Sequence, residues 1–189
     1  MKKYQIIYAD PPWNLHGINK QGIVTSRDSP NNPKYAHLNQ YNALSYDNIR
    51  RLPIKELGDD NCVLFLWAVD NSLPFVFDII EAWGFVYKTV AFTWVKKTVS
   101  GKDFFGMGQW TRNNPETCLL ATRGNIKRVD AGVRQLQYYP IAEHSKKPDE
   151  FRNEIVKLCG DLPRIELFAR QKTEGWDVWG NEVESNIEL

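Results

Sequence analysis

The chain has 189 residues, 42% of them hydrophobic, and a formal net charge of +1. This composition predicts one globular domain, residues 1–189, with a sizeable core. The near-neutral charge excludes a uniformly basic protein, so any site for a polyanion must be local. The three cysteines are far apart and lack the spacing of a redox motif, which predicts reduced thiols and a cytoplasmic protein.

A membrane protein and a metalloenzyme are two further classes that the sequence does not favour. No stretch reaches the roughly 18 apolar residues of a membrane span, and the lysines at positions 2 and 3 lead into an apolar run rather than a signal peptide. The histidines at 16, 37 and 144 lack metal-ligand spacing, so we expect neither membrane insertion nor a metal.

The first predicted element is a strand over residues 4–9, which ends at Asp10-Pro11-Pro12-Trp13. Two consecutive prolines cannot donate ladder hydrogen bonds, so the strand must end there. Open α/β sheets bind ligands at the carboxyl ends of their strands. Carboxylate and carbonyl oxygens suit an amino group, and an indole face suits a flat ring. The alternative is an ordinary strand followed by a turn and a core tryptophan.

Strands then alternate with helices along the chain, which predicts a mostly parallel, twisted sheet with helices on both faces. The predicted elements are a helix from Ser45 interrupted at Pro53, a strand 62–67, a helix from Pro74 to Gly84, strands 86–95, 117–122 and 133–141, a helix from Pro148 to Gly160 and a strand 164–169. Two irregular segments, 14–40 and 96–114, are long enough to be functional or disordered loops.

Motifs spread over nearly the whole chain resemble the N6-adenine methyltransferase family that includes the catalytic subunit of messenger-RNA adenosine methyltransferase. They are Asp10 to Trp13, Tyr41-Asn42-Ala43-Leu44-Ser45, Leu64 to Trp67, Gly108-Gln109-Trp110 through Glu116 to Leu119, Ser145 to Glu150, Ile165 to Arg170 and Trp176 to Asn181. The resemblance implies a Rossmann-like methyltransferase fold that uses S-adenosylmethionine. It also implies that the acceptor motif precedes the cofactor-binding strand.

The predicted catalytic residues are Asp10, Pro11, Pro12, Trp13 and Tyr41. We expect the Asp10 carboxylate and the Pro11 carbonyl to accept the two N–H bonds of the adenine amine, which turns its lone pair toward the donor methyl. Trp13 and Tyr41 are expected to stack on the base. For Tyr41, an ordinary surface tyrosine is the alternative.

A second group of residues is predicted to bind the cofactor, and it consists of Asp10, Lys147, Phe168, Ala169, Arg170, Asn181 and Glu182. Residues 168–170 follow a buried strand, where an α/β fold places its ligand. Lys147 precedes a helix start and could bind the methionine carboxylate, or could be a solvated charge. Asn181 could reach the ribose or the adenine edge.

The predicted substrate contacts are Trp13, Tyr41, Glu116, Lys97 and Arg112. Glu116 is included because of the resemblance. The basic residues fall into two clusters, Lys96, Lys97, Lys102 and Arg112 among aromatic residues, and Arg123, Lys127, Arg128 and Arg134. A basic segment with aromatic residues suits nucleic-acid backbone contacts and base stacking, although such clusters can also be solvated faces.

The sequence therefore predicts methylation of the N6 amine of adenine in DNA. The small single-domain build favours DNA, and the same reaction on RNA is the first alternative. The second is a non-catalytic, nucleic-acid-binding partner subunit, which would be expected to lose the acceptor motif or the cofactor turn. A homodimer, or a heterodimer with a related subunit, could form through residues 96–114.

Overall fold

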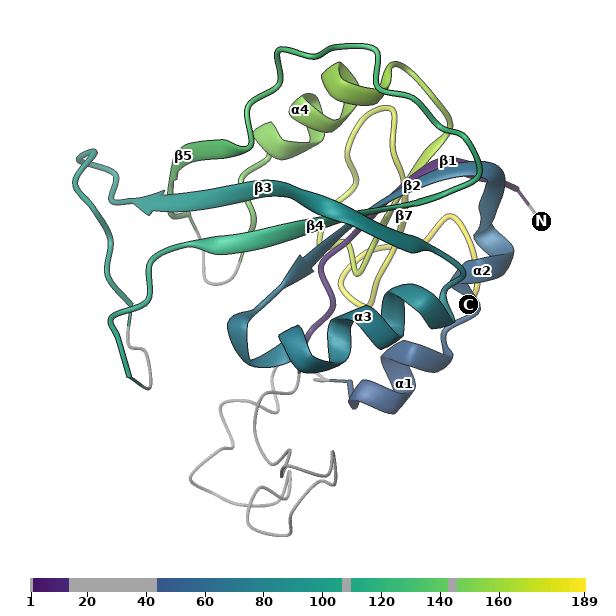
Figure 1. Ribbon diagram of the computed structural model, residues 1–189, viewed down its shortest axis with the longest axis horizontal. Coiled ribbons are helices and arrows are strands. Elements are labelled where there is room, and N and C mark those ends of the chain that lie inside the picture. Colours follow the sequence, from purple (N-terminus) through teal and green to yellow (C-terminus); the bar gives the residue numbers. More distant parts are fainter. Residues whose placement is uncertain (1, 14–43, 107–109, 143–145) are drawn as a thin grey trace, which may run out of the picture.

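A seven-stranded sheet forms the centre of the computed structural model, which describes residues 2–13, 44–106, 110–142 and 146–189 (Figure 1). The strands are β1 (Tyr4–Ala9), β2 (Gly58–Ala68), β3 (Val86–Lys97), β4 (Glu116–Arg123), β5 (Leu136–Pro140), β6 (Arg164–Leu167) and β7 (Asp177–Trp179). Their order is β5-β3-β4-β2-β1-β6-β7. Of these strands, β4 alone runs opposite to its neighbours, and the others are mutually parallel.

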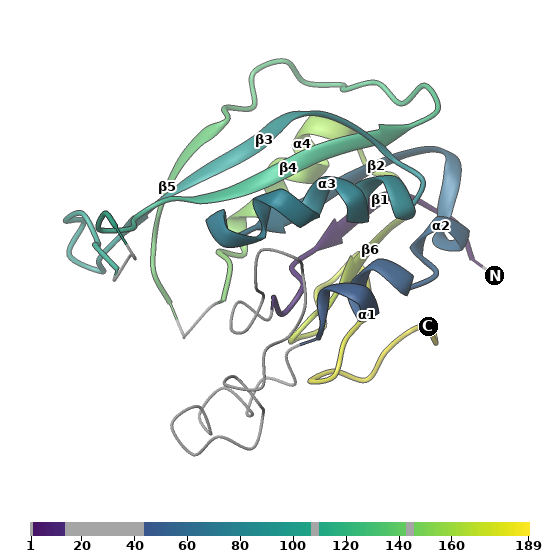
Figure 2. The ribbon, with the colours of Figure 1, turned by 60° about the horizontal axis from the view of Figure 1, so that its bottom comes forward.

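Helices cover both faces of this sheet. They are α1 (Tyr46–Arg51), α2 (Ile54–Leu57), the 3-10 turn η3 (Asp70–Ser72), α3 (Leu73–Ala82) and α4 (Glu150–Cys159). Figures 1 and 2 show α1 and α3 on one face of the sheet and α4 on the other. The predicted Rossmann-like α/β fold is confirmed, and no helix in the described ranges is long and apolar enough to cross a membrane.

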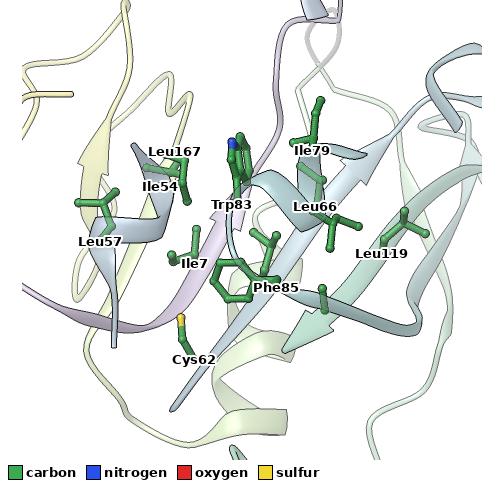
Figure 3. Packing of buried hydrophobic residues seen from close by; sticks show 14 of the residues in the cluster. Ile7, Ile54, Leu57, Cys62, Leu66, Ile79, Trp83, Phe85, Leu119 and Leu167 are labelled. Atoms are coloured by element: carbon green, nitrogen blue, oxygen red, sulfur yellow. The ribbon is translucent and has the colours of Figure 1, made fainter. Parts of the chain in front are cut away.

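The alternation of side chains along β1 explains the two-sided core. Ile7 and Ala9 pack in the cluster that includes α1, α2 and α3, and Figure 3 shows part of it. Ile6 and Tyr8 point to the opposite face, where they join the cluster around α4. Because both faces of the strand are buried, a shift of one residue in its register would exchange the two sets of side chains.

Local chemistry accounts for the helix ends. The Ser45 hydroxyl caps α1 by accepting the backbone N–H of Asn48 at 3.2 Å, and Pro53 separates α1 from α2. Helix α4 begins at Glu150 rather than at the predicted Pro148. Its end at Gly160, where φ is +89°, is as expected for a residue that needs the left-handed region.

Candidate active site

The carboxyl ends of β1 and β6 meet at one edge of the sheet. Ala9 pairs with Leu167, so the residues that follow them, Asp10 and Phe168, leave the sheet beside one another. These residues belong to the predicted acceptor motif and the predicted cofactor turn. The parallel pairing thus brings together two segments that are far apart in the sequence.

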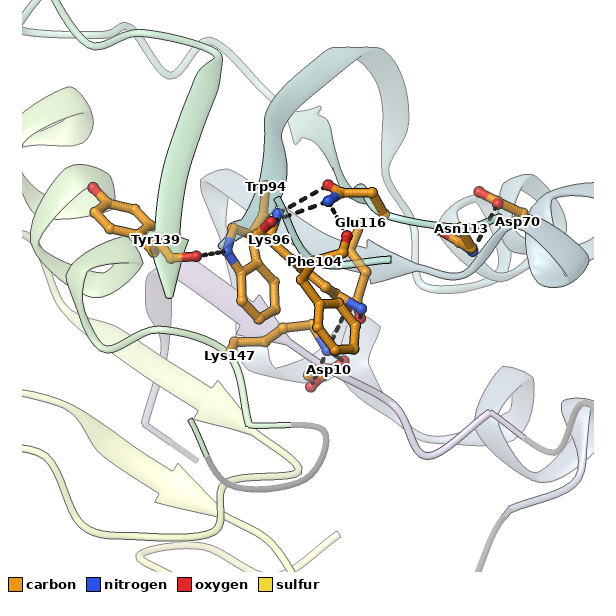
Figure 4. A network of polar contacts seen from close by, with 10 residues as sticks. Asp10, Asp70, Trp94, Lys96, Phe104, Asn113, Glu116, Tyr139 and Lys147 are labelled. Carbon is orange, nitrogen blue, oxygen red and sulfur yellow. Dashed lines mark hydrogen bonds and ion pairs between the residues drawn. The ribbon is translucent and has the colours of Figure 1, made fainter. Parts of the chain in front are cut away.

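A chain of alternating charges crosses this edge (Figure 4). The Lys147 ammonium lies 2.9 and 2.8 Å from the two carboxylate oxygens of Asp10 and 3.0 Å from Oε2 of Glu116. Oε1 of Glu116 pairs with the Lys96 ammonium at 2.6 Å. These ion pairs connect the ends of β1, β3 and β4 to the segment before α4. The ammonium of Lys147 also lies 5.2 Å from the centre of the Trp67 ring.

Burial and pairing have opposite effects on these groups. Burial raises the pKa of Asp10 above its ordinary value despite the nearby Lys147 ammonium. Burial also opposes charge on Glu116 and Lys147, but the opposite charges around them outweigh it, so that the pKa of Glu116 is lowered and that of Lys147 is raised. Lys147 is therefore held as a cation, with Glu116 as its anionic partner.

The residues after Asp10 form a tight turn. The backbone N–H of Trp13 donates to the Pro11 carbonyl at 2.8 Å, and the N–H of Leu44 donates to the Pro12 carbonyl at 3.3 Å. The Trp13 indole N–H donates to the Trp67 carbonyl at 3.1 Å, which fixes the ring to the end of β2. A carbonyl oxygen has two lone pairs, so Pro11 keeps one for a ligand. Tyr41 lies outside the described residues.

The turn after β6 has an unusual backbone. The predicted strand 164–169 ends early, at Leu167, because Phe168 has φ +62°, and no other described non-glycine residue has a positive φ. The Phe168 ring packs edge-on against Trp179, with ring centres 5.3 Å apart. The Ala169 N–H donates to the Trp179 carbonyl at 2.9 Å, so β7 supports this turn.

Gly180 allows this close approach. A Cβ at position 180 would lie 2.1 Å from the carbonyl oxygen and 2.8 Å from the nitrogen of Ala169. Since these are backbone atoms, we expect Gly180→Ala to displace the turn and to lower the free energy of unfolding by about 1–3 kcal/mol in urea denaturation. Gly132→Ala is the control, because there the nearest atom belongs to the Asp130 side chain. Equal losses in both variants would contradict the expectation.

The remaining predicted cofactor residues lie at the surface beside this turn. Arg170 pairs with Glu182 at 3.3 Å, and Asn181 is exposed two residues after β7. The structure therefore groups residues 168–170 with 180–182 and brings Lys147 to Asp10. The roles proposed for these residues in cofactor binding stay predictions.

Two predicted substrate residues form contacts within the loop that follows β3. Lys97 pairs with Asp103 at 2.6 Å, and Arg112 donates to the carbonyls of Gly106 and Phe105 at 2.9 and 3.2 Å. Lys96, predicted as part of a basic cluster, forms an ion pair with Glu116 that the sequence did not predict. Trp94, two positions earlier, is buried on the α4 face of the sheet. Because alternate residues of a strand share a face, Trp94 is the local signal that could have placed the Lys96 side chain on that side.

The matches to known proteins fit this geometry. The MT-A70 family model matches residues 4–182. The chain belongs to the MT-A70 family. Type II methyltransferase M.MunI from Mycoplasma sp is 34% identical over 192 residues, which cover 98% of this chain and 80% of that protein. The predictions of the family and of methyltransferase activity are confirmed.

Two human proteins match over almost the same part of this MT-A70 chain. The N(6)-adenosine-methyltransferase catalytic subunit METTL3 is 27% identical over 96% of the chain, which spans 28% of METTL3. The N(6)-adenine-specific methyltransferase METTL4 is also 27% identical over 96% of the chain, which spans 38% of METTL4. The similarity to the two human proteins therefore concerns less than half of each.

Proposed function

We propose that this protein transfers a methyl group from S-adenosylmethionine to the exocyclic N6 amine of adenine in DNA. The observation that carries the proposal is the position of Asp10 beside Phe168 at the carboxyl edge of β1 and β6. The names of METTL3 and METTL4 support N6 of adenine as the target. The type II methyltransferase, of which the chain covers 80%, supports DNA as the substrate.

The acceptor side of the reaction rests on Asp10 and Pro11. The amine of adenine is a poor nucleophile because its lone pair is delocalised into the ring. Hydrogen bonds from its two N–H groups to the Asp10 carboxylate and to the free lone pair of Pro11 favour a tetrahedral nitrogen. Lys147 contacts both oxygens of Asp10, but a carboxylate has about four acceptor positions, so the amine can bind while that ion pair persists.

The residues around the turn after β6 fit the cofactor. S-adenosylmethionine, when bound, supplies a methyl group on a positively charged sulfur. The Gly180–Ala169 contact leaves no room for a side chain, which suits a backbone that closely approaches a ligand. Arg170, Asn181 and Glu182 offer donors and acceptors for ribose hydroxyls. Lys147 would bind a carboxylate by exchanging one of its present partners, Asp10 or Glu116.

The direct test is incubation of the protein with labelled S-adenosylmethionine and DNA, followed by nucleoside analysis for N6-methyladenine. Matched DNA and RNA oligonucleotides in parallel decide between the two substrates, and RNA is the second candidate because METTL3 matches over 96% of the chain. A non-catalytic partner subunit should fail to bind S-adenosylhomocysteine in calorimetry. Retention of Asp10 and of the cofactor turn favours the enzyme.

The loop between β3 and β4 is the proposed contact with nucleic acid. We call its described residues, 98–106 and 110–115, the arm, and Figure 1 shows it projecting beyond the sheet. The base of the arm is fixed because Asn114 exchanges hydrogen bonds with the backbone of Lys96 at 3.0 Å in both directions. The Trp110 side chain is 98% exposed on this arm, which is unusual for so large an apolar group.

We expect Trp110→Ala to weaken the binding of a DNA oligonucleotide by about 5- to 100-fold, the loss of one stacked base contact. Fluorescence anisotropy measures this, and Trp110→Tyr, which keeps an aromatic face, is the control. Unchanged DNA binding together with a loss of dimers in light scattering would instead make the arm a dimer contact.

The buried, unpaired thiols at 62, 118 and 159 support the cytoplasm as the location.

A further inference from the structure

A second charged cluster, apart from the residues used in the proposed reaction, lies where α4 packs on β6. The Arg152 guanidinium forms a two-pronged ion pair with Glu166, with Nε to Oε2 and Nη2 to Oε1 both at 2.7 Å. The two side chains are 8% and 9% exposed. The two parallel hydrogen bonds fix the relative orientation of the two side chains. Loss of either partner would leave an unpaired charge in the interior.

The cluster extends outward to the two segments that carry the proposed cofactor residues. Nη1 of Arg152 donates to Oδ1 of Asp149 at 2.6 Å, and the same oxygen accepts Nε2 of Gln171 at 3.1 Å. The Lys146 ammonium lies 3.2 Å from Oε1 of Gln171 and 3.4 Å from Oδ2 of Asp149. The cluster thus runs from the interior to the surface without a break.

The neighbours of these residues in the sequence show what the cluster connects. Lys146 directly precedes Lys147, and Gln171 directly follows Arg170. The contacts between residues 146, 149 and 171 therefore join the segment before α4 to the turn after β6. Asp149 is 56% exposed, so its ion pairs add little to stability, but they restrict the separation of the two segments.

We propose that Arg152 and Gln171 are positioning residues, which act through Asp149 to hold Lys147 and the turn 168–170 at the separation that the cofactor requires. The inference rests on the proposed function. A site that is already arranged does not lose binding free energy to ordering its own segments, so the cluster contributes to cofactor affinity rather than to methyl transfer itself.

The first test variant is Gln171→Met, which removes the contacts of Gln171 with Asp149 and Lys146 but leaves the buried ion pair intact. We expect calorimetry to show about 3- to 10-fold weaker binding of S-adenosylhomocysteine, the loss of a hydrogen bond to a charged group. The melting temperature and the turnover at saturating S-adenosylmethionine should stay close to those of the wild type. A merely structural role would change the melting temperature and not the affinity.

The second variant is Arg152→Lys, which keeps a cation beside Glu166 but loses the fork that also reaches Asp149. Both variants act through Asp149. The affinity of the double variant for S-adenosylhomocysteine should therefore fall by less than the product of the two single losses. Asp161→Asn is the matched control. Its 87% exposed carboxylate pairs with Arg164 in the loop between α4 and β6, at the amino end of β6 and away from residues 146, 149 and 171.

The outcomes separate the two proposals. A wild-type protein that binds no S-adenosylhomocysteine would overturn the proposed function, and with it the inference. If the wild type binds but Gln171→Met binds equally well, or loses no more affinity than Asp161→Asn, the inference alone is overturned. Strictly multiplicative effects of Gln171→Met and Arg152→Lys would also overturn it, because they would show that the two residues act independently.

Discussion

Replacement of Asp10 by asparagine should reduce turnover at saturating cofactor by at least about 100-fold. The variant keeps the size of the side chain but removes the negative charge that accepts the amine N–H. A lost hydrogen bond to a charged acceptor accounts for about 1.5–3 kcal/mol, and a poorly aligned amine adds to this. The uncharged amide also gives up the ion pair with Lys147, which then keeps Glu116 as its anionic partner.

The measurement is the initial rate of N6-methyladenine formation, with binding of S-adenosylhomocysteine followed in parallel to show that the site persists. Asp177→Asn is the control. Asp177 also pairs with a lysine, Lys2 at 2.6 Å, but it is the first residue of β7 and lies at the amino ends of the parallel strands, opposite Asp10. An Asp10→Asn variant that turns over within a few fold of the wild type would rule out the proposed grip on the amine.

Replacement of Phe151 by alanine should lower the free energy of unfolding by about 3–5 kcal/mol. The ring is fully buried and lies at the centre of the aromatic cluster under α4. Its centre is 4.9 Å from that of Trp67, 5.2 Å from that of Phe92 and 5.3 Å from that of Tyr139. The loss combines the transfer of apolar area, the cavity that remains and the edge-to-face contacts.

Urea denaturation followed by tryptophan fluorescence measures this loss. Phe77→Ala is the control, because Phe77 is 46% exposed and its ring packs against Tyr87 at the surface, a contact expected to contribute at most about 1.5 kcal/mol. Similar losses in the two variants would show that the cluster around Phe151 contributes no more to the free energy of unfolding than a surface contact does.

The local features of the fold could be predicted from the sequence. The Pro11-Pro12 pair ends β1, Ser45 caps α1, and the apolar run 62–67 lies within β2, all through effects that span a few residues. The predicted strand 133–141 proved shorter, Leu136–Pro140, and β2 proved longer, Gly58–Ala68. Strand ends depend on which neighbour is available for pairing, and propensity does not encode that.

The contacts of the site could be predicted only in part. The position of Asp10 after a strand indicated a ligand site, but its ion pair with Lys147 joins residues 137 positions apart. No local pattern specifies such a pair, since it depends on the order of the strands. The same holds for Glu116, which reads as a strand-end residue until β4 is placed between β3 and β2.

The reversed direction of β4 has a consequence for how the protein can change. Because β4 runs against its neighbours, its first residue, Glu116, lies at the end of the sheet where β3 and β2 finish. The described ends of the β3–β4 connection therefore lie on the same side of the sheet as Asp10, while the proposed cofactor turn follows β6 and is supported by β7. Under the proposed function, insertions in that connection would change the surface offered to nucleic acid and leave the turn after β6 in place, so target preference could change without changes to that turn.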